Sequence, residues 1–304
     1  MQSGDSTAVA ISGLRPGEQV RGVFACTRKD RLFTRSGSPY LALELRDRSG
    51  SIAARAFQDA DALAGRFERG ELVRVSGRVE RFRDQPVVEI VDIARVPVGG
   101  AGAEGDPESF LPVAYRDRDE LEGFLEHLAG EVSDRGFRAL LDGFLGDAGL
   151  RSEWRRAPCT RNGHHAYLGG LLEHTVAVAT LAYEVCQLHS RLSQDLLLTA
   201  AIVHDLGRTR EFVYGAEIGL SDEGRLLGHL VIGERMVSER AGMLDEARRL
   251  ALLHCLLCHH GPASAPGGRF ASVEALTLYR LNAVDASVKG AFEHGLEALP
   301  VSRA

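Results

Sequence analysis

The segment AIVHDLGR, residues 201–208, ends a run of apolar residues with a histidine directly followed by an aspartate. Bringing two ionisable side chains to the edge of an apolar core is unfavourable by several kcal/mol unless each finds a partner. A metal ion is a partner that satisfies an imidazole and a carboxylate together. His204 and Asp205 are therefore candidate metal ligands, provided that the chain supplies others.

Further histidines and aspartates interrupt other apolar, helix-like segments in the second half of the chain. The full candidate ligand set is His174, His204, Asp205, His229, His259 and Asp285, with His260 directly after His259. A single histidine on an apolar helix face is more often a hydrogen-bonded core residue than a ligand, but an ordered series of this length is rare by chance. Imidazole and carboxylate ligands together favour manganese, iron, cobalt, nickel or zinc over magnesium.

The ordered series H…HD…D, with two further histidines between its members, resembles the HD superfamily of metal-dependent phosphohydrolases. The resemblance implies one metal ion held by the set His174, His204, Asp205 and Asp285. It also implies a second ion, held by His229 and His259 and joined to the first by Asp205. Two such ions, with manganese as the first choice, lower the pKa of a shared water and neutralise charge on a phosphoryl oxygen, which suits the hydrolysis of phosphate esters.

Two longer motifs narrow the resemblance. RNGHHAYLGGLLEHT at residues 161–175 and LLHCLLCHHG at residues 252–261, with the GHL around His229, are similar to the YhaM-type 3′-to-5′ exoribonucleases. That resemblance implies an N-terminal oligonucleotide-binding (OB) barrel, single-stranded RNA as substrate, DNA as a second candidate, and nucleoside monophosphates as products. It also selects His259 as the ligand, whereas the residues alone leave His259 and His260 open.

Several residues beside the ligands are candidate catalytic or substrate-contacting groups. The catalytic candidates are Asp205, Arg208, His164, His165 and His260, and the nucleic-acid contacts expected near them are Arg161 and Tyr167. Arg208 stands where the similar family commonly has lysine, and its guanidinium offers a bidentate, permanently charged phosphate contact. A surface arginine without a role is the equal alternative. His164 and His165 would contact phosphate or sugar, or would only cap and pack the helix that follows.

The elements that must position these residues fall into two classes. Alternating apolar residues and turn signals from Gly17 to Ala94 predict three strands, a helix and two strands, which suits a small OB barrel. After residue 116, apolar residues recur at three- and four-residue intervals, which predicts helices throughout. The predicted fold is therefore multidomain: an all-β OB-fold barrel at 1–97, a linker rich in Gly, Pro and acidic residues at 98–115, and an all-α HD domain at 116–304.

The barrel carries residues suited to single-stranded nucleic acid, which binds by base stacking on aromatic rings and by basic contacts to its backbone. The candidate contacts are Phe33, Arg35, Phe82 and Arg83, all in expected loops, while other aromatic residues must fill the core. Residues 1–98 hold 16 Lys and Arg against 13 Asp and Glu, whereas residues 99–304 hold 20 against 29. The first part is therefore the better suited to a polyanion.

Composition places the chain among ordinary globular proteins. Its 304 residues, 44% hydrophobic and 26% charged, are enough for two domains. Because the N-terminus has no export signal and no apolar run is long enough to cross a bilayer, we expect a cytoplasmic protein with no membrane partner. Five cysteines without framework-like spacing indicate reduced thiols. A homo-oligomer is left open.

Two rival functions remain at this level. A phosphohydrolase of small nucleotides would use the same metal centre, but such a substrate needs no strand-binding barrel. A single-strand-binding protein with a structural HD domain would bind without metal-dependent turnover, and the complete ligand series argues against it.

Overall fold

A computed structural model describes residues 10–100, 102–264 and 266–295 of the chain. The chain divides into two compact units. The barrel unit is Met1–Pro112 with Tyr214–Ile218, and the helical unit is Val113–Val213 with Gly219–Ala304. The division after Pro112 falls inside the linker expected at 98–115.

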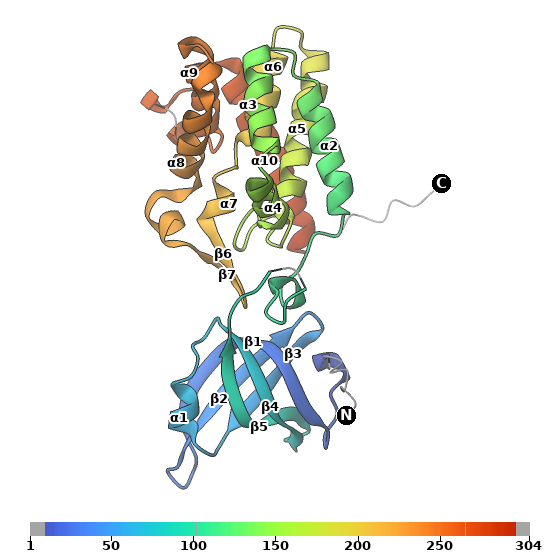
Figure 1. The fold of residues 1–304 in the computed structure, drawn as a ribbon, viewed down its shortest axis with the longest axis vertical. Coiled ribbons are helices and arrows are strands. Elements are labelled where there is room, and N and C mark those ends of the chain that lie inside the picture. Colours follow the sequence, from blue (N-terminus) through green and yellow to red (C-terminus); the bar gives the residue numbers. More distant parts are fainter. Residues whose placement is uncertain (1–9, 101, 265, 296–304) are drawn as a thin grey trace, which may run out of the picture. The chain divides into compact units, whose positions relative to one another are not determined.

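The barrel unit is built on five strands (Figure 1). They are β1 (Gln19–Phe33), β2 (Pro39–Asp47), β3 (Gly50–Ala56), β4 (Leu72–Phe82) and β5 (Gln85–Val96), with the short helix α1 (Ala60–Ala64) between β3 and β4. The strands close in the order β1-β2-β3-β5-β4 because β1 pairs with both β2 and β4. The β3–β5 pairing is parallel and the other pairings are antiparallel. The predicted OB-type barrel and its order of elements are confirmed.

The interior of the barrel follows the alternation of the strands. Leu41, Leu43 and Leu45 of β2 are fully buried and share one core with residues of β4 and β5 such as Val75 and Ile93. Successive side chains of a strand point to opposite faces, so the apolar alternation directs every second residue inward. The opposite face of the same strands is left for polar and aromatic side chains.

The helical unit contains the remaining long helices (Figure 1). They are α2 (Arg118–Gly130), α3 (Arg135–Leu145), α4 (Ala148–Arg156), α5 (Gly170–Leu188), α6 (Gln194–Val203), α8 (Asp222–Arg240), α9 (Glu246–Cys258) and α10 (Val273–Glu293), with the single turn α7 (Arg208–Glu211). Helix α5 packs against α2, α4, α6 and α10. It is therefore the central helix of the core that positions the candidate ligand set.

Most of these helices begin at a side chain that satisfies their free backbone N–H groups. The N-caps whose side chains accept such a hydrogen bond are Asp117 (α2), Asp134 (α3), Asp147 (α4), Ser221 (α8), Asp245 (α9) and Ser272 (α10). Asp and Ser are preferred there because their oxygens replace the missing intrahelical acceptor. Among the described helices, none is long and apolar enough to span a membrane. The cytoplasmic location stays a prediction.

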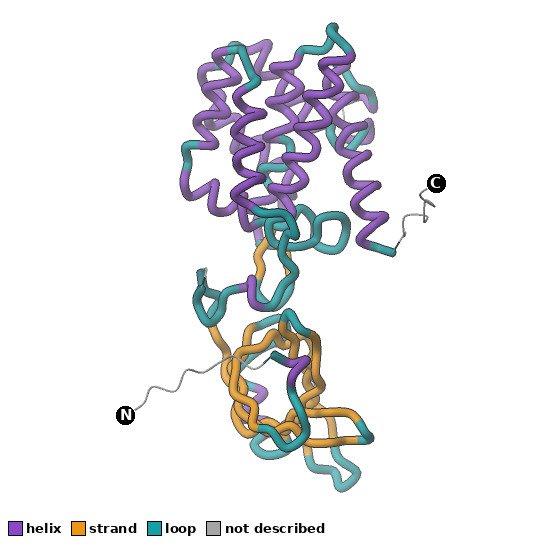
Figure 2. Tube along the Cα trace, turned by 90° about the vertical axis from the view of Figure 1, so that its right-hand side faces the viewer, coloured by secondary structure: helices purple, strands orange, loops and turns teal. Residues whose placement is uncertain are grey.

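The expectation of helices throughout the second part is wrong at one place. Strands β6 (Phe212–Tyr214) and β7 (Ile218–Leu220) form a two-stranded sheet of their own after α7, in addition to the closed barrel, and Figure 2 draws them as strands among the helices of the chain's second part. Each strand has three residues, too few for alternation to be recognised. Its turn residue Ala216 is buried with Leu72 and Val96, and Arg46 Nη2 donates to the Ala216 carbonyl at 2.6 Å.

Candidate metal centre

The candidate ligands lie close together within the helical unit, although they come from five helices and the turn after α6. His174 lies in the second turn of α5, His204 caps the end of α6, His229 lies in α8, His259 caps the end of α9, and Asp285 lies in α10. Asp205 follows α6 directly. A non-helical residue in α8, Gly228 with φ of 70°, turns the chain immediately before His229. A left-handed φ of this kind favours glycine.

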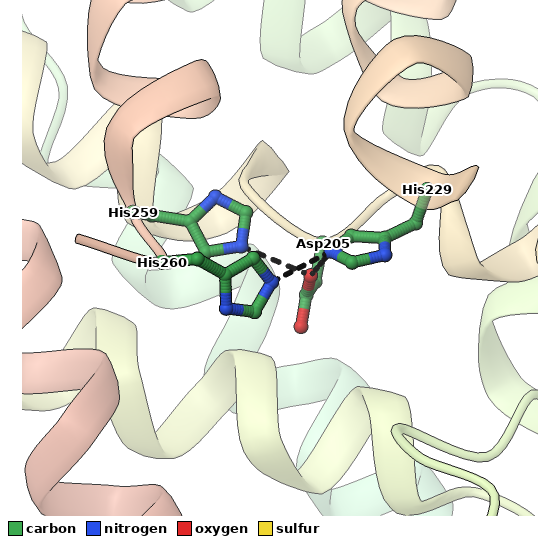
Figure 3. A group of neighbouring side chains, drawn as sticks. All are labelled: Asp205, His229, His259 and His260. Atoms are coloured by element: carbon green, nitrogen blue, oxygen red, sulfur yellow. Dashed lines mark hydrogen bonds and ion pairs between the residues drawn. The ribbon is translucent and has the colours of Figure 1, made fainter. Parts of the chain in front are cut away.

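One group of ligand atoms surrounds Asp205 Oδ1, as Figure 3 shows. His259 Nε2 lies 3.3 Å and His229 Nε2 3.4 Å from this oxygen. His260 Nε2 lies 2.8 Å from His229 Nε2. One ligand atom from each of the four residues lies within 4.8 Å of all the others. We call this group the second metal position, and it contains both His259 and His260.

A further group faces the other oxygen of the same carboxylate. His174 Nε2 and His204 Nε2 lie 3.1 Å apart, and each lies 3.7 Å from Asp205 Oδ2. The three residues are all buried. We call this group the first metal position. Asp205 therefore has one oxygen at each position, as expected for a bridging carboxylate.

The ends of α6 and α9 fix which nitrogen of two histidines is free. His204 Nδ1 lies 2.8 Å from the Ala201 carbonyl, and His259 Nδ1 lies 2.6 Å from the Leu256 carbonyl. Both carbonyls belong to the last turn of a helix, where no intrahelical N–H is available. Each ring therefore donates its Nδ1 hydrogen to the helix end, which leaves a lone pair on Nε2.

At both metal positions, buried hydrogen-bond acceptors therefore face other acceptors. The Nε2 lone pair of His259 faces the carboxylate oxygen Oδ1 of Asp205, and among the described residues neither atom has a hydrogen-bond partner although both are buried. At the first metal position, His174 Nδ1 is occupied by Asp285 Oδ2 at 2.6 Å, so its Nε2 lone pair faces that of His204. Buried acceptors without donors are costly, and a cation between them satisfies them.

The charge states suit cation binding. Burial lowers the pKa of both His204 and His259, so the two rings are neutral near pH 7. Burial would raise the pKa of Asp205, but Arg208 and the surrounding imidazoles hold it well below its usual range. Metal ligands must be neutral imidazoles and ionised carboxylates. The donor set therefore fits divalent ions at both positions.

Asp285 lies on the far side of His174 from the first metal position. Its Oδ2 also lies 3.0 Å from His165 Nε2. Burial opposes ionisation, but the hydrogen bonds from His165 and His174 hold the pKa of Asp285 far below its usual range. A carboxylate on the second nitrogen of a metal-binding histidine fixes the ring and raises its basicity. Its placement is that of a positioning residue, and the ligand role implied by the resemblance stays a prediction.

Arg208 is buried, so the alternative of a surface arginine is wrong. Its Nε lies 3.0 Å from Asp205 Oδ2 and its Nη1 lies 2.9 Å from Glu211 Oε2. Glu211 in turn accepts from the backbone N of His229 at 3.1 Å and lies 3.1 Å from its Nδ1. Glu211 thus links Arg208 to His229, a role that its sequence context, RTREFVY, does not reveal. The phosphate contact of Arg208 stays a prediction.

The segment before α5 holds the paired histidines in a fixed turn. His165 has a left-handed φ of 51°, and its backbone N donates to Glu293 Oε2 at 2.9 Å. Its Nδ1 lies 2.8 Å from the Tyr167 hydroxyl, which donates to Glu173 Oε2 at 2.9 Å. Strained backbone that several contacts hold in place is characteristic of functional sites. His164 is half-buried and Arg161 is exposed, and their substrate contacts stay predictions.

The barrel unit presents exposed aromatic rings next to basic side chains. Phe33 is 61% and Phe82 42% exposed, with Arg31 4.9 Å from the first ring and Arg55 3.8 Å from the second. Arg35 and Arg83 are exposed in the turns that follow these rings. Phe24, by contrast, is buried in the barrel core. The two phenylalanines expected to be exposed are therefore available for stacking.

Comparison with protein families agrees with this geometry. A family model described as an HD domain matches residues 171–287, which include both metal positions. Residues 171–287 are therefore similar to HD domains. A second model, described as an OB-fold nucleic acid binding domain, matches residues 20–93. The predicted combination of an OB-fold domain with an HD domain is confirmed.

Curated relatives are similar to this chain over most of its length. The 3′-5′ exoribonuclease YhaM of Listeria welshimeri is 28% identical over 83% of this chain and 80% of the relative. The protein of the same name from Bacillus subtilis is 26% identical over 90% and 86%. The second OB-fold domain of replication protein A from Methanococcus maripaludis has a TM-score of 0.23 and 22% identity over 29% of this chain and 93% of that domain. The resemblance of this chain to the YhaM-type exoribonucleases is confirmed.

Proposed function

We propose that this protein is a metal-dependent 3′-to-5′ exoribonuclease that hydrolyses single-stranded RNA to nucleoside monophosphates. The observation that carries the proposal is the pair of buried contacts in which acceptors face acceptors beside Asp205: His259 Nε2 against Asp205 Oδ1, and His174 Nε2 against His204 Nε2. The direction of cleavage and the RNA substrate rest on the names of the curated relatives.

Two divalent ions would be held by these residues, the first by His174, His204 and Asp205 and the second by Asp205, His229, His259 and His260. When bound, such ions lower the pKa of water toward neutrality and neutralise charge that develops on a phosphoryl oxygen. Manganese accepts the nitrogen and oxygen ligands of the second metal position, and iron, cobalt, nickel and zinc do so as well.

The chain's own residues prepare the centre for a polyanionic substrate. Asp205 stays ionised and places one oxygen at each position, while Arg208 offsets its charge inside the unit. Glu211 fixes the ring of His229 through its Nδ1. His260 is exposed beside the second metal position, so it is the ring of that group best placed to meet a terminal phosphodiester.

The barrel unit would hold the strand. Phe33 and Phe82 offer faces for base stacking, and the arginines beside them attract the phosphate backbone. Stacking is tolerant of sequence because every base has a π-face. We therefore expect an exonuclease with little sequence preference and with DNA as a second candidate substrate.

The direct test is a time course of 5′-labelled single-stranded RNA with manganese on a sequencing gel. We expect shortening by single nucleotides from the 3′ end, abolished by a chelator and by Asp205→Asn, which keeps the size of the side chain and removes its charge. Asp142→Asn is the matched control, because Asp142 is an exposed carboxylate of α3 paired with Arg138 at 3.0 Å.

Each contrary outcome favours a rival function. RNA that stays intact while bound would support a single-strand-binding protein with a structural HD domain. RNA that is neither bound nor cut, together with phosphate release from nucleotides, would support a small-nucleotide phosphohydrolase.

A further inference from the structure

A network of polar contacts beside the first metal position has no part in the function proposed above. Its centre is Glu173, which directly precedes His174 in α5 and is only 8% exposed. Glu173 Oε2 accepts a hydrogen bond from the Tyr167 hydroxyl at 2.9 Å, and its Oε1 lies 3.0 Å from Lys289 Nζ of α10. The carboxylate thus joins α5 both to α10 and to the turn that precedes α5.

The Tyr167 hydroxyl connects this network to the metal centre. It lies 2.8 Å from His165 Nδ1, and the other nitrogen of that ring, Nε2, lies 3.0 Å from Asp285 Oδ2. The same oxygen of Asp285 lies 2.6 Å from His174 Nδ1. The contacts therefore form a closed ring, which begins at Glu173 and returns to α5 at the neighbouring His174.

The burial of Glu173 calls for an explanation other than stability. A buried ion pair is often no more stable than apolar side chains of similar size. Lys289 supplies the opposite charge, and its ammonium also lies 5.4 Å from the centre of the Tyr167 ring. Burial and the nearby Glu173 carboxylate raise the pKa of Tyr167, so the hydroxyl keeps its proton. Because an ionised carboxylate only accepts hydrogen bonds, Glu173 fixes the direction of that hydroxyl.

The turn that carries Tyr167 is held at a further point. The backbone N of His165 donates to Glu293 Oε2 at 2.9 Å, and Glu293 Oε1 lies 3.9 Å from Lys289 Nζ. The His165 ring is therefore fixed by its backbone and at both of its nitrogens. A carboxylate in contact with the second nitrogen of a metal-binding histidine fixes the ring of that histidine, so the orientation of Asp285 matters for the centre.

We propose that Tyr167 and Glu173 are positioning residues of the metal centre: acting through His165, they orient the Asp285 carboxylate against His174. The inference rests on the proposed function for the presence of the centre. It replaces the nucleic-acid contact expected of Tyr167 from the sequence, because protein groups already engage the hydroxyl on both sides.

The test compares Tyr167→Phe with the wild type, as full-length proteins with manganese, on single-stranded RNA and on bis(p-nitrophenyl) phosphate. We expect kcat to fall by about 10–100-fold on both substrates. KM for RNA should be unchanged, because the loss lies in the centre and not in strand binding. Tyr183→Phe is the matched control, because Tyr183 lies toward the other end of α5 and its hydroxyl is hydrogen-bonded to another glutamate, Glu131. Its kinetics should equal those of the wild type.

Glu173→Gln gives a second reading, because it keeps the size of the side chain and removes its charge. Since both residues act through one chain of contacts, the double variant should be no less active than the less active of the two single variants. Losses that multiply would overturn the shared chain. Thermal unfolding checks that each variant folds, and Glu173→Gln carries the two-substrate comparison if Tyr167→Phe does not.

Two kinetic outcomes would overturn the positioning role and leave the exonuclease proposal intact. One is a raised KM for RNA in Tyr167→Phe with unchanged turnover of the small ester, which would favour a nucleic-acid contact. The other is unchanged kinetics on both substrates. A wild type that hydrolyses the small ester but not RNA would contradict the proposed function, while the ester alone would still test the positioning role. A wild type that hydrolyses neither would contradict both proposals.

Discussion

Asp205 is the residue on which the whole centre depends, because each of its oxygens meets a different set of imidazoles. Its ionisation is secured inside the protein by Arg208 at 3.0 Å. A buried carboxylate with a single partner would be costly, and here the same negative charge attracts the arginine and two cation positions. Charge balance in the centre therefore extends beyond the ligands to Arg208 and Glu211.

Glu211→Gln tests this wider balance. The variant keeps the size of the side chain but weakens the hold on the His229 ring and on Arg208, so we expect metal affinity or RNA hydrolysis to fall by about 10–100-fold. Metal titration and initial rates on labelled RNA measure the effect. Glu223→Gln is the control, because Glu223 pairs with Arg210 at 2.9 Å away from the ligand groups. Equal losses in both variants would contradict a specific role for Glu211.

The residue types were predictable where they broke an apolar pattern, as His229 and His259 do within their helical segments. Their partners were not, because a helical period gives the face of a residue but not which ring nitrogen meets which neighbour. The contact of Asp285 with Nδ1 of His174 is of this kind. Glu211 lies in the single turn α7, where no period exists to mark it.

At the scale of elements, the centre depends on the close approach of α8 to the turn after α6. A Cβ atom at Gly207 would lie 2.1 Å from the His229 carbonyl oxygen and 2.6 Å from the backbone N of Gly233. Only glycine allows these backbones to meet. The Gly207 that follows the His-Asp pair is thus needed for the position of a ligand from another helix.

Gly207→Ala should therefore displace α8 and destabilise the protein by about 1–3 kcal/mol. We also expect weaker binding at the second metal position, because His229 moves with the helix. Thermal unfolding and metal titration measure the two effects. Gly143→Ala is the control, since nothing lies within 4 Å of a Cβ built at this α3 residue. A Gly207→Ala variant as stable and as active as the control would refute the steric argument.

Asp147 joins two elements, as the N-cap of α4 and the partner of Arg240 at 3.0 Å at the end of α8. The hydrogen bond from the Leu150 N–H and the contact with Arg240 lower its pKa. A carboxyl whose pKa is lower in the folded state stabilises the fold above its unfolded value of about 3.9, and this contribution is lost as the pH falls further.

Asp147→Asn keeps an oxygen at the cap and removes the charge, so it should lower the Tm near neutral pH. The difference from the wild type should persist down to the unfolded pKa of about 3.9 and should close as the pH falls below it, through the lowered pKa of the folded state. Unfolding followed by circular dichroism at several pH values gives the difference curve. A gap that stays constant over this range, or one equally large in Asp142→Asn, would show that the charge of Asp147 is not the cause.

Elements were predictable in proportion to their length. The barrel strands and the long helices follow from periods repeated over many residues, as in Leu41, Leu43 and Leu45 of β2. The β6–β7 hairpin was missed because three-residue strands carry no period. Its turn is held by contacts such as that of Arg46 with Ala216, 170 residues apart in the chain, and local sequence cannot reveal those.

At the scale of the whole molecule, strand binding and hydrolysis are assigned to different units. We expect Phe33→Ala to weaken RNA binding by about 1–3 kcal/mol, the usual contribution of one stacked base. KM on RNA should rise roughly fivefold or more, while turnover of bis(p-nitrophenyl) phosphate, which needs no strand binding, stays unchanged. Val91→Ala is the control, because Val91 is 77% exposed in β5. Loss of both activities in Phe33→Ala would point to misfolding instead.

The two helix ends that fix the rings of His204 and His259 also determine how easily this part of the helical unit opens locally. The last turn of a helix ordinarily opens and closes at little cost, well below the energy of global unfolding. With cations bound, opening the end of α6 or of α9 would carry a ligand away. Asp205, which follows α6, has an oxygen at both metal positions, so the stabilities of these two turns, 55 residues apart in the chain, would be coupled through the ions. At a metal concentration one hundred times the Kd, this linkage adds about 2.7 kcal/mol to each opening. The supply of metal would thus set how long the core of the helical unit stays closed.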